Sequence, residues 1–125
     1  MRKLTVLICI FLILSGLLIA YPEWQPFGEQ KKLTVLVHIW LGLFFLVIFP
    51  MYAWDHIRTH RKRLKKITWI SLSGLLQLLT GCGLILTGIV LLLFNSNTLT
   101  IPTQIHEILT YLLIGTLIIH ARVTR

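Results

Sequence analysis

Residues 67–94 read ITWISLSGLLQLLTGCGLILTGIVLLLF and contain no Asp, Glu, Lys or Arg. A helix needs roughly 20 apolar residues to cross the hydrocarbon core of a bilayer, so this stretch predicts a membrane-spanning helix. The composition of the 125-residue chain agrees, since 56% of its residues are hydrophobic and only 13% are charged. Soluble domains carry about 25% charged residues. The composition therefore excludes an ordinary soluble domain, a disordered chain and a disulfide scaffold.

Three more apolar runs lie around this stretch: two are uncharged, and the last carries Glu107 within its first turns. The charges that bound them predict four spans in all, at residues 4–21, 33–54, 67–94 and 103–121. Polar, turn-forming residues 95–98 and Pro102 separate the last two spans. The predicted fold class is all-α: a bundle of four transmembrane helices that forms a single membrane domain over residues 1–125.

The basic residues predict the orientation of the spans. Ten of the twelve Lys and Arg residues lie before the first span, between the second and third, or after the fourth, which is one side of the membrane. Cytoplasmic segments carry an excess of Lys and Arg, so we expect both termini in the cytoplasm and a multi-pass protein of the inner membrane. Lys31 and Lys32 are expected on the periplasmic side.

Two segments allow a second interpretation. Residues 1–20 have the charged start and apolar run of a cleaved signal peptide, but Leu18 is bulkier than the residue preferred before a cleavage site, and a retained helix is favoured. Residues 55–66 are predicted to be a solvated basic loop against anionic lipid headgroups, with a protein partner as the alternative. The sequence contains no basic surface interleaved with aromatic residues, so it gives no sign of nucleic-acid binding.

Motifs for several kinds of chemistry are absent from the sequence. Cys9 and Cys82 lie in the middle of spans and far apart, which is not the spacing of covalently bound haem or of an iron–sulfur cluster. No nucleotide-binding glycine loop, catalytic carboxylate pair or nucleophile motif occurs. If the chain takes part in an enzyme, other subunits are expected to supply the substrate site.

Four of the five histidines fall at two matched depths. His38 and His106 lie near the outer ends of the second and fourth spans, and His56 and His120 lie at their inner ends. His38 and His56 are 18 residues apart, and His106 and His120 are 14 residues apart. At about 100° per residue, each spacing returns the second imidazole to nearly the same face of its helix as the first. If the two stripes face each other, they predict two sites for axial ligation of haem iron, His38 with His106 and His56 with His120.

The third span carries a matching pattern of small residues. Gly74 and Gly88 are 14 residues apart, as are His106 and His120, and they are predicted to leave clearance for haem. Glycine also serves plain helix packing, and a lone histidine at a helix end is often an interfacial side chain. Zinc fits less well, because a structural zinc site needs four ligands and only two imidazoles converge.

These residues together resemble the bacterial di-haem membrane cytochromes b. That family includes the b-type subunits of formate dehydrogenases and hydrogenases and the four-helix haem-binding half of quinol-oxidising cytochrome b. The matching features are His38-x3-Gly42, Tyr52-x3-His56, Ser73-Gly74, Thr87-Gly88 and His106-x13-His120. The resemblance implies two b haems that carry electrons across the membrane, between a quinone pool and a periplasmic redox partner.

The chain departs from the family at the inner ligand of the second span. The family spacing is shorter and leads to Tyr52, so His56 is the predicted inner ligand and His60, within the basic loop, is the alternative. The expected partners are membrane lipid and either other redox subunits or a periplasmic cytochrome or oxidoreductase. The alternative function is a haem-free membrane anchor or accessory subunit of a larger complex. An ion or proton carrier is disfavoured, because no carboxylate lies deep in a span.

Overall fold

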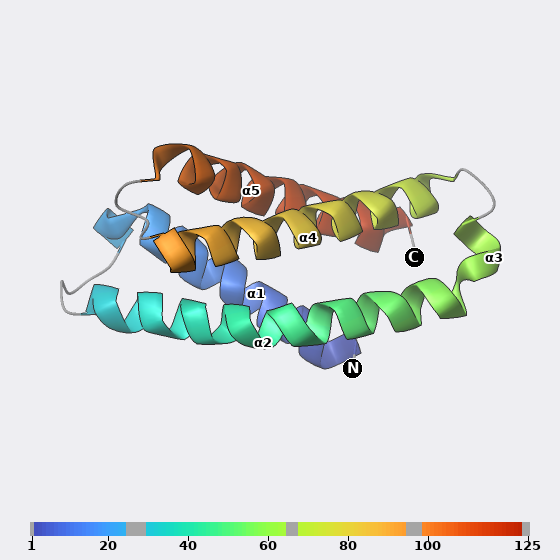
Figure 1. Ribbon diagram of the computed structural model, residues 1–125. Coiled ribbons are helices and arrows are strands. Elements are labelled where there is room, and N and C mark those ends of the chain that lie inside the picture. Colours follow the sequence, from blue (N-terminus) through green and yellow to red (C-terminus); the bar gives the residue numbers. More distant parts are fainter. Residues whose placement is uncertain (1, 25–29, 65–67, 95–98, 124–125) are drawn as a thin grey trace. The chain divides into compact units, whose positions relative to one another are not determined.

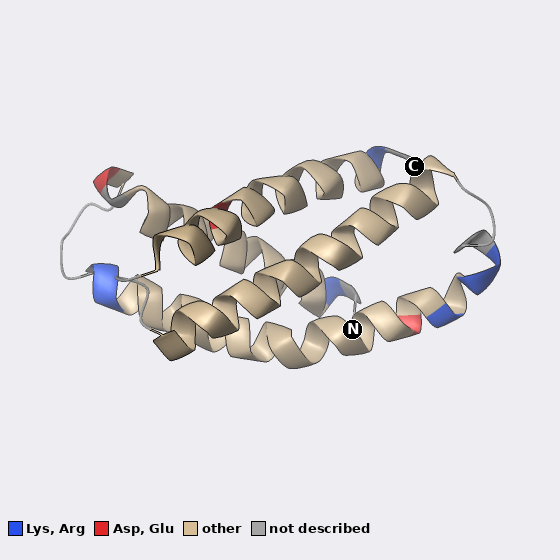
Figure 2. Ribbon diagram, turned by 45° about the horizontal axis from the view of Figure 1, so that its top comes forward, with Lys and Arg blue, Asp and Glu red and all other residues tan. Residues whose placement is uncertain are grey.

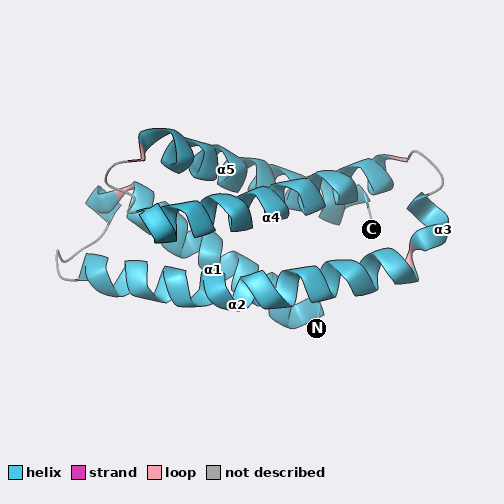
Figure 3. Ribbon diagram, in the orientation of Figure 1, coloured by secondary structure: helices cyan, strands magenta, loops and turns pink. Residues whose placement is uncertain are grey.

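The computed structural model describes residues 2–24, 30–64, 68–94 and 99–123. Over these ranges the chain is helical and contains no strand (Figure 3). Four helices are long and apolar enough to cross a membrane, which confirms the predicted fold class. The helices are α1 (Arg2–Ala20), α2 (Gln30–Thr59), α4 (Trp69–Phe94) and α5 (Thr100–Val123), with the short η1 (Pro22–Trp24) and α3 (Arg61–Leu64) beside them (Figure 1). The predicted turn at 95–98 and the charges of Glu29, Lys65, Lys66 and Arg125 lie outside the described residues.

Local chemistry explains where the third long helix begins. Thr68 precedes α4, and its Oγ1 accepts a hydrogen bond of 3.2 Å from the backbone N–H of Ser71. The Ser71 hydroxyl oxygen in turn accepts a hydrogen bond of 2.8 Å from the backbone N–H of Thr68. This reciprocal pair is a capping box, which supplies acceptors to N–H groups that the first turn of a helix leaves without intrahelical partners.

The second helix is longer than the predicted span. We expected a loop from residue 55, but α2 continues to Thr59, and a short helix, α3, follows within the same basic segment. The predicted boundary at residue 54 was drawn from the first charge, and a charge ends the apolar run without breaking a helix. The one proline within α2, Pro50, removes one backbone donor but does not end the helix.

The chain divides into two compact units, residues 1–52 and 53–125. Unit 1 contains α1, η1 and most of α2. Unit 2 contains the end of α2, α3, α4 and α5. The division lies between Tyr52 and Ala53, within the continuous helix α2.

In unit 2, α4 and α5 lie side by side along their length (Figure 1). Small and polar residues dominate the buried positions: Thr80 and Thr116 are each 3% exposed, and their hydroxyls donate to carbonyls of their own helices. A Cβ built on Gly83 would lie 2.9 Å from Cδ1 of Leu109, so the glycine permits close approach of the helices. Close packing through small residues is the usual way in which helices associate in lipid.

The outer surfaces of the helices are apolar. Leu33, Trp69 and Leu93 are each more than 60% exposed, and many other large hydrophobic side chains are exposed as well. Among the described residues, Lys and Arg occur near helix ends and in α3, and α4 contains no charged residue (Figure 2). Such surfaces suit contact with lipid. The predicted orientation and the choice of the inner membrane stay predictions.

Candidate functional site

Three of the five histidines share one local arrangement. In each, the imidazole Nδ1 lies within hydrogen-bond distance of a Ser or Thr hydroxyl on a neighbouring helix, and its Cε1 lies beside the glycine that follows this hydroxyl residue. We call each set a seat. The Ser15 seat consists of Ser15, Gly16 and His38; the Ser73 seat of Ser73, Gly74 and His120; and the Thr87 seat of Thr87, Gly88 and His106.

The Ser15 seat joins α1 and α2 within unit 1. The Ser15 hydroxyl lies 2.8 Å from Nδ1 of His38. A Cβ built on Gly16 would lie 3.3 Å from Cε1 of the same ring, which is closer than carbon atoms normally approach. Only glycine therefore allows the imidazole to rest directly against the backbone of α1 without a shift.

The other two seats join α4 and α5 within unit 2. Nδ1 of His106 lies 2.7 Å from the Thr87 hydroxyl, and Nδ1 of His120 lies 2.9 Å from the Ser73 hydroxyl. The hydroxyl residues are 14 positions apart on α4, and the histidines are 14 positions apart on α5, so the antiparallel helices keep one register. At 1.5 Å per residue, the two imidazoles are about 21 Å apart along α5.

A third contact confirms this register between the two seats. Nε2 of Gln77 donates a hydrogen bond of 3.1 Å to the backbone carbonyl of Thr116. Gln77 is four positions beyond Ser73 on α4, and Thr116 is four positions before His120 on α5. The histidines are therefore held by a regular helix pair rather than by an isolated contact.

The hydroxyl contacts indicate the tautomer of the three imidazoles. Each hydroxyl carries one hydrogen and also contacts a carbonyl of its own helix: Ser15 with Phe11 at 2.7 Å, Ser73 with Ile70 at 3.1 Å and Thr87 with Gly83 at 2.8 Å. A carbonyl only accepts, so the hydroxyl donates to it, and its oxygen accepts from the imidazole N–H. We infer that each neutral imidazole carries its hydrogen on Nδ1 and its lone pair on Nε2.

This tautomer is the form in which histidine binds a metal ion. Metal-bound imidazoles ligate through one nitrogen and donate the other N–H to a fixed acceptor, which sets the ring orientation. Among the described residues, no group of three or more His, Cys, Asp or Glu side chains gathers to hold an ion. A cofactor that needs one or two imidazoles for each iron makes no such demand.

Comparison with protein-family models, curated proteins and solved structures finds no match for this chain.

The structure gives Gly74 and Gly88 a definite neighbour. A Cβ built on either glycine would lie 3.6 Å from the Cε1 of the imidazole in its seat, His120 or His106. Each glycine therefore lets an imidazole lie against the backbone of α4. The haem clearance predicted for these two glycines stays a prediction.

His56 and His60 have different surroundings from the seated histidines. His56 lies in the last turn of α2 and His60 directly follows the helix. Their ring centroids are 4.7 Å apart in an edge-on arrangement. The backbone N–H of His60 donates to the carbonyl of His56. The glycines found against an imidazole contact His38, His106 and His120. The role of His56 as inner ligand, with His60 as the alternative, stays a prediction.

Sequence reasoning missed the role of Ser15. A signal for it exists, because Ser or Thr directly precedes glycine at four places in the chain, and three of these pairs form seats. The fourth pair, Thr80-Gly81, lies midway between the other two on α4, and the register places it opposite Leu113 rather than a histidine. The dipeptide is thus informative only where the facing residue is histidine.

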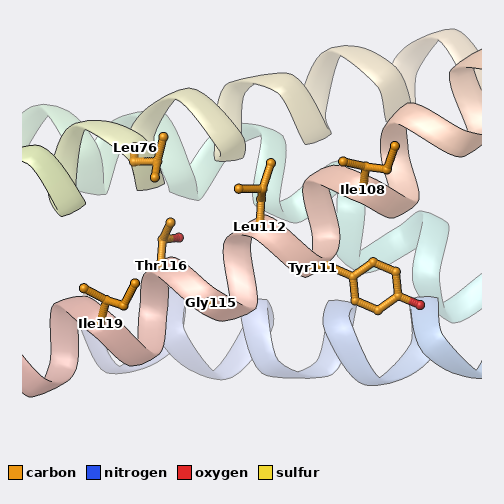
Figure 4. A pocket seen from close by; sticks show the side chains of 7 residues that line it. All are labelled: Leu76, Ile108, Tyr111, Leu112, Gly115, Thr116 and Ile119. Atoms are coloured by element: carbon orange, nitrogen blue, oxygen red, sulfur yellow. The ribbon is translucent and has the colours of Figure 1, made fainter.

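Unit 2 also has a shallow apolar groove of about 460 Å³, lined by one residue of α4 and six of α5 (Figure 4). The lining residues are Leu76, Ile108, Tyr111, Leu112, Gly115, Thr116 and Ile119. No imidazole or charged group lines the groove. It offers contact with apolar groups but no chemistry that we assign to a reaction.

Proposed function

We propose that this chain is a membrane-spanning b-type cytochrome, in which His38, His106 and His120 are axial ligands of haem iron. The observation that carries the proposal is the repeated seat. One isolated Ser–His hydrogen bond is ordinary helix contact, but the same hydroxyl, glycine and imidazole occur three times with Nδ1 distances of 2.7–2.9 Å. Each occurrence directs the lone pair of a neutral imidazole to Nε2.

The residues of each seat have separate tasks in this proposal. The hydroxyl accepts from Nδ1–H and so holds the ring plane and the tautomer, as acceptors do behind metal-bound histidines. The glycine brings the ring against the helix backbone. The apolar spans exclude water from the middle of the membrane. Haem iron, when bound, cycles between ferric and ferrous states and supplies one-electron chemistry.

Two seats on one helix pair support a path for electrons across the membrane. His106 and His120 lie near opposite ends of α5, about 21 Å apart along the helix, so each would serve a haem near a different membrane surface. The sequence predicts the second ligands as His38 for the haem on His106 and His56 for the haem on His120. We further propose a quinone as the electron donor or acceptor in the membrane and a redox subunit or periplasmic cytochrome as partner.

A spectrum of the purified full-length protein tests the proposal. The protein is solubilised in detergent, and a b-type signal is expected in the dithionite-reduced minus oxidised spectrum, with haem extracted by acidic acetone. His106→Ala should remove the haem signal that depends on this ligand. Leu113→Ala is the matched control, because Leu113 is 5% exposed, lies on the same face of α5 and bears no ligand atom. The control should keep the full haem content.

The alternative function, a haem-free membrane anchor, predicts a reduced minus oxidised spectrum without a b-type signal. In an anchor the hydroxyl–imidazole hydrogen bonds hold helices together, each contributing about 0.6 kcal/mol in a membrane protein. Folded protein that shows no b-type signal, even when produced with added haem precursor, would leave the anchor as the better account.

A further inference from the structure

Gln77 is the only amide side chain of α4, a helix that otherwise carries apolar residues, glycine and small hydroxyl residues. An amide in an apolar environment costs free energy unless it is hydrogen-bonded. Nε2 of Gln77 donates to the backbone carbonyl of Thr116 on α5 at 3.1 Å, and Thr116 is 3% exposed. The two helices of unit 2 are therefore joined by a protected hydrogen bond that involves no residue of a seat.

The carbonyl that Gln77 contacts also holds the backbone of His120. In an α-helix each N–H donates to the carbonyl four residues earlier, so the backbone N–H of His120 donates to the carbonyl of Thr116. A carbonyl oxygen has two lone pairs and can accept both hydrogen bonds. The amide from α4 and the backbone of the proposed haem ligand therefore meet at one oxygen atom.

The Ser73 seat lies close to the ends of both helices, where such a contact matters most. Ser73 is the fifth residue of α4, and His120 is the fourth residue from the end of α5. Helix ends fray, because the last carbonyls and the first N–H groups of a helix have no intrahelical partners. Gln77 lies one turn further along α4 than Ser73, so its hydrogen bond fixes α5 on the interior side of the seat.

The Thr87 seat is held by a different contact on its interior side. Gly83 lies one turn before Thr87 on α4, and a Cβ built on it would lie 2.9 Å from Cδ1 of Leu109 on α5. Close apolar packing therefore joins the helices beside this seat, where an amide hydrogen bond joins them beside the other. A change at Gln77 should act on the seat of His120 and leave that of His106 in place.

We propose that Gln77 is a positioning residue for the haem ligand His120, an inference that rests on the proposed function. It holds the last turns of α5 in register with α4, so that Nδ1 of His120 stays 2.9 Å from the Ser73 hydroxyl. Donation from Nδ1–H makes an imidazole a more basic ligand, which favours ferric over ferrous iron. Loss of the Gln77 hydrogen bond weakens this donation and raises the reduction potential of the haem on His120.

A redox titration of the full-length protein in detergent, followed by its visible spectrum, tests the inference. The haem signal that His120→Ala removes identifies the haem on this ligand. Gln77→Met keeps the side-chain length without the donor, and should raise the reduction potential of that haem while the haem on His106 is unchanged. Gln77→Asn, whose amide is one methylene shorter, should have the same effect. Leu113→Ala is the matched control, because it removes a side chain that is 5% exposed in the same helix pair and keeps the Gln77 donor; both potentials should stay unchanged.

A double-mutant cycle separates positioning from general helix packing. If Gln77 acts through the hydroxyl contact of His120, Gln77→Met should cause no further shift of the potential in a protein that already carries Ser73→Ala. Additive shifts overturn the inference, as do equal shifts of both haems or an unchanged haem on His120 in the Gln77 variants. In each of these results the unaltered protein still has its b-type signal, so the proposed function stands. Unaltered protein without haem defeats the proposed function, and the inference with it.

Discussion

Replacing Gly16 by alanine tests whether the His38 imidazole really lies against the backbone of α1. The new Cβ would be 3.3 Å from Cε1 of His38, whereas carbon atoms pack best at about 3.5–4.0 Å. The ring must therefore move by a few tenths of an ångström. It cannot move without disturbing the 2.8 Å contact between Nδ1 and the Ser15 hydroxyl. Overpacking of this kind costs about 1–3 kcal/mol.

Alanine at this position also stabilises the helix, and this gain has to be subtracted from the cost of overpacking. In a helix interior it is more stable than glycine by about 0.5–1 kcal/mol, since glycine loses more backbone freedom on folding. We therefore expect Gly16→Ala to lower the free energy of unfolding by about 0–2.5 kcal/mol. The control is Gly42→Ala in the same unit, because nothing lies within 4 Å of a Cβ built on Gly42. This variant should raise the free energy of unfolding by about 0.5–1 kcal/mol.

The assay is denaturant-induced unfolding in mixed detergent micelles, followed by circular dichroism, with both variants measured against the unaltered protein. The difference between the two variants is the informative quantity, because it cancels the propensity of alanine. If Gly16→Ala is as stable as Gly42→Ala, the imidazole is not packed on Gly16 and the account of the Ser15 seat is wrong. The haem content of Gly16→Ala should also fall, while that of Gly42→Ala should not.

Three further predictions concern the other seats, a helix start and the topology. Ser73→Ala removes the acceptor of the His120 Nδ1–H and should lower the free energy of unfolding by about 0.6–1.7 kcal/mol. Thr80→Ala, which loses a hydrogen bond within α4 alone, should cost less in the same unfolding assay. Thr68→Ala should cost about 0.5–2 kcal/mol by removing the cap of α4, which Ser71 alone does not replace. Reporters fused to either terminus should be active only in the cytoplasm, and a periplasmic signal from either would contradict the charge argument.

The sequence predicts most of the fold because lipid imposes a simple requirement. Apolar runs of sufficient length have to be helices, and the four predicted spans all coincide with the long helices. The predicted end of the second span, at residue 54, was wrong as a helix end, because α2 continues past the first charge, Asp55, to Thr59. Lipid limits where charges lie, but outside the membrane a helix continues until a breaker or cap ends it.

Only part of the candidate site could be predicted from the sequence, because the rest depends on which residues of neighbouring helices face each other. Spacing and depth single out four histidines, His38, His56, His106 and His120. The structure places His38, His106 and His120 in seats, and the role of His56 stays a prediction. The contribution of Ser15 was missed because it depends on which helix faces His38, which spacing along one helix does not reveal. The tautomer requires the direction of a hydroxyl hydrogen, and this depends on carbonyls of the neighbouring helix. The pairing of imidazoles across the two units was predicted and stays a prediction.

The helix pair of unit 2 shows how one packing interface can hold both a seated imidazole and an ordinary apolar contact. On α4 a hydroxyl–glycine dipeptide recurs every seven residues, beginning at Ser73, Thr80 and Thr87, whereas the facing positions of α5 alternate between histidine and leucine. At the middle position Leu113 is 5% exposed, and the Thr80 hydroxyl donates within α4. Because the α4 side is nearly the same at all three positions, the residue on α5 decides whether a position packs or presents an imidazole. The depth of each proposed haem is therefore set by the placement of histidine on α5, and α4 supplies the same small, hydroxyl-bearing surface throughout.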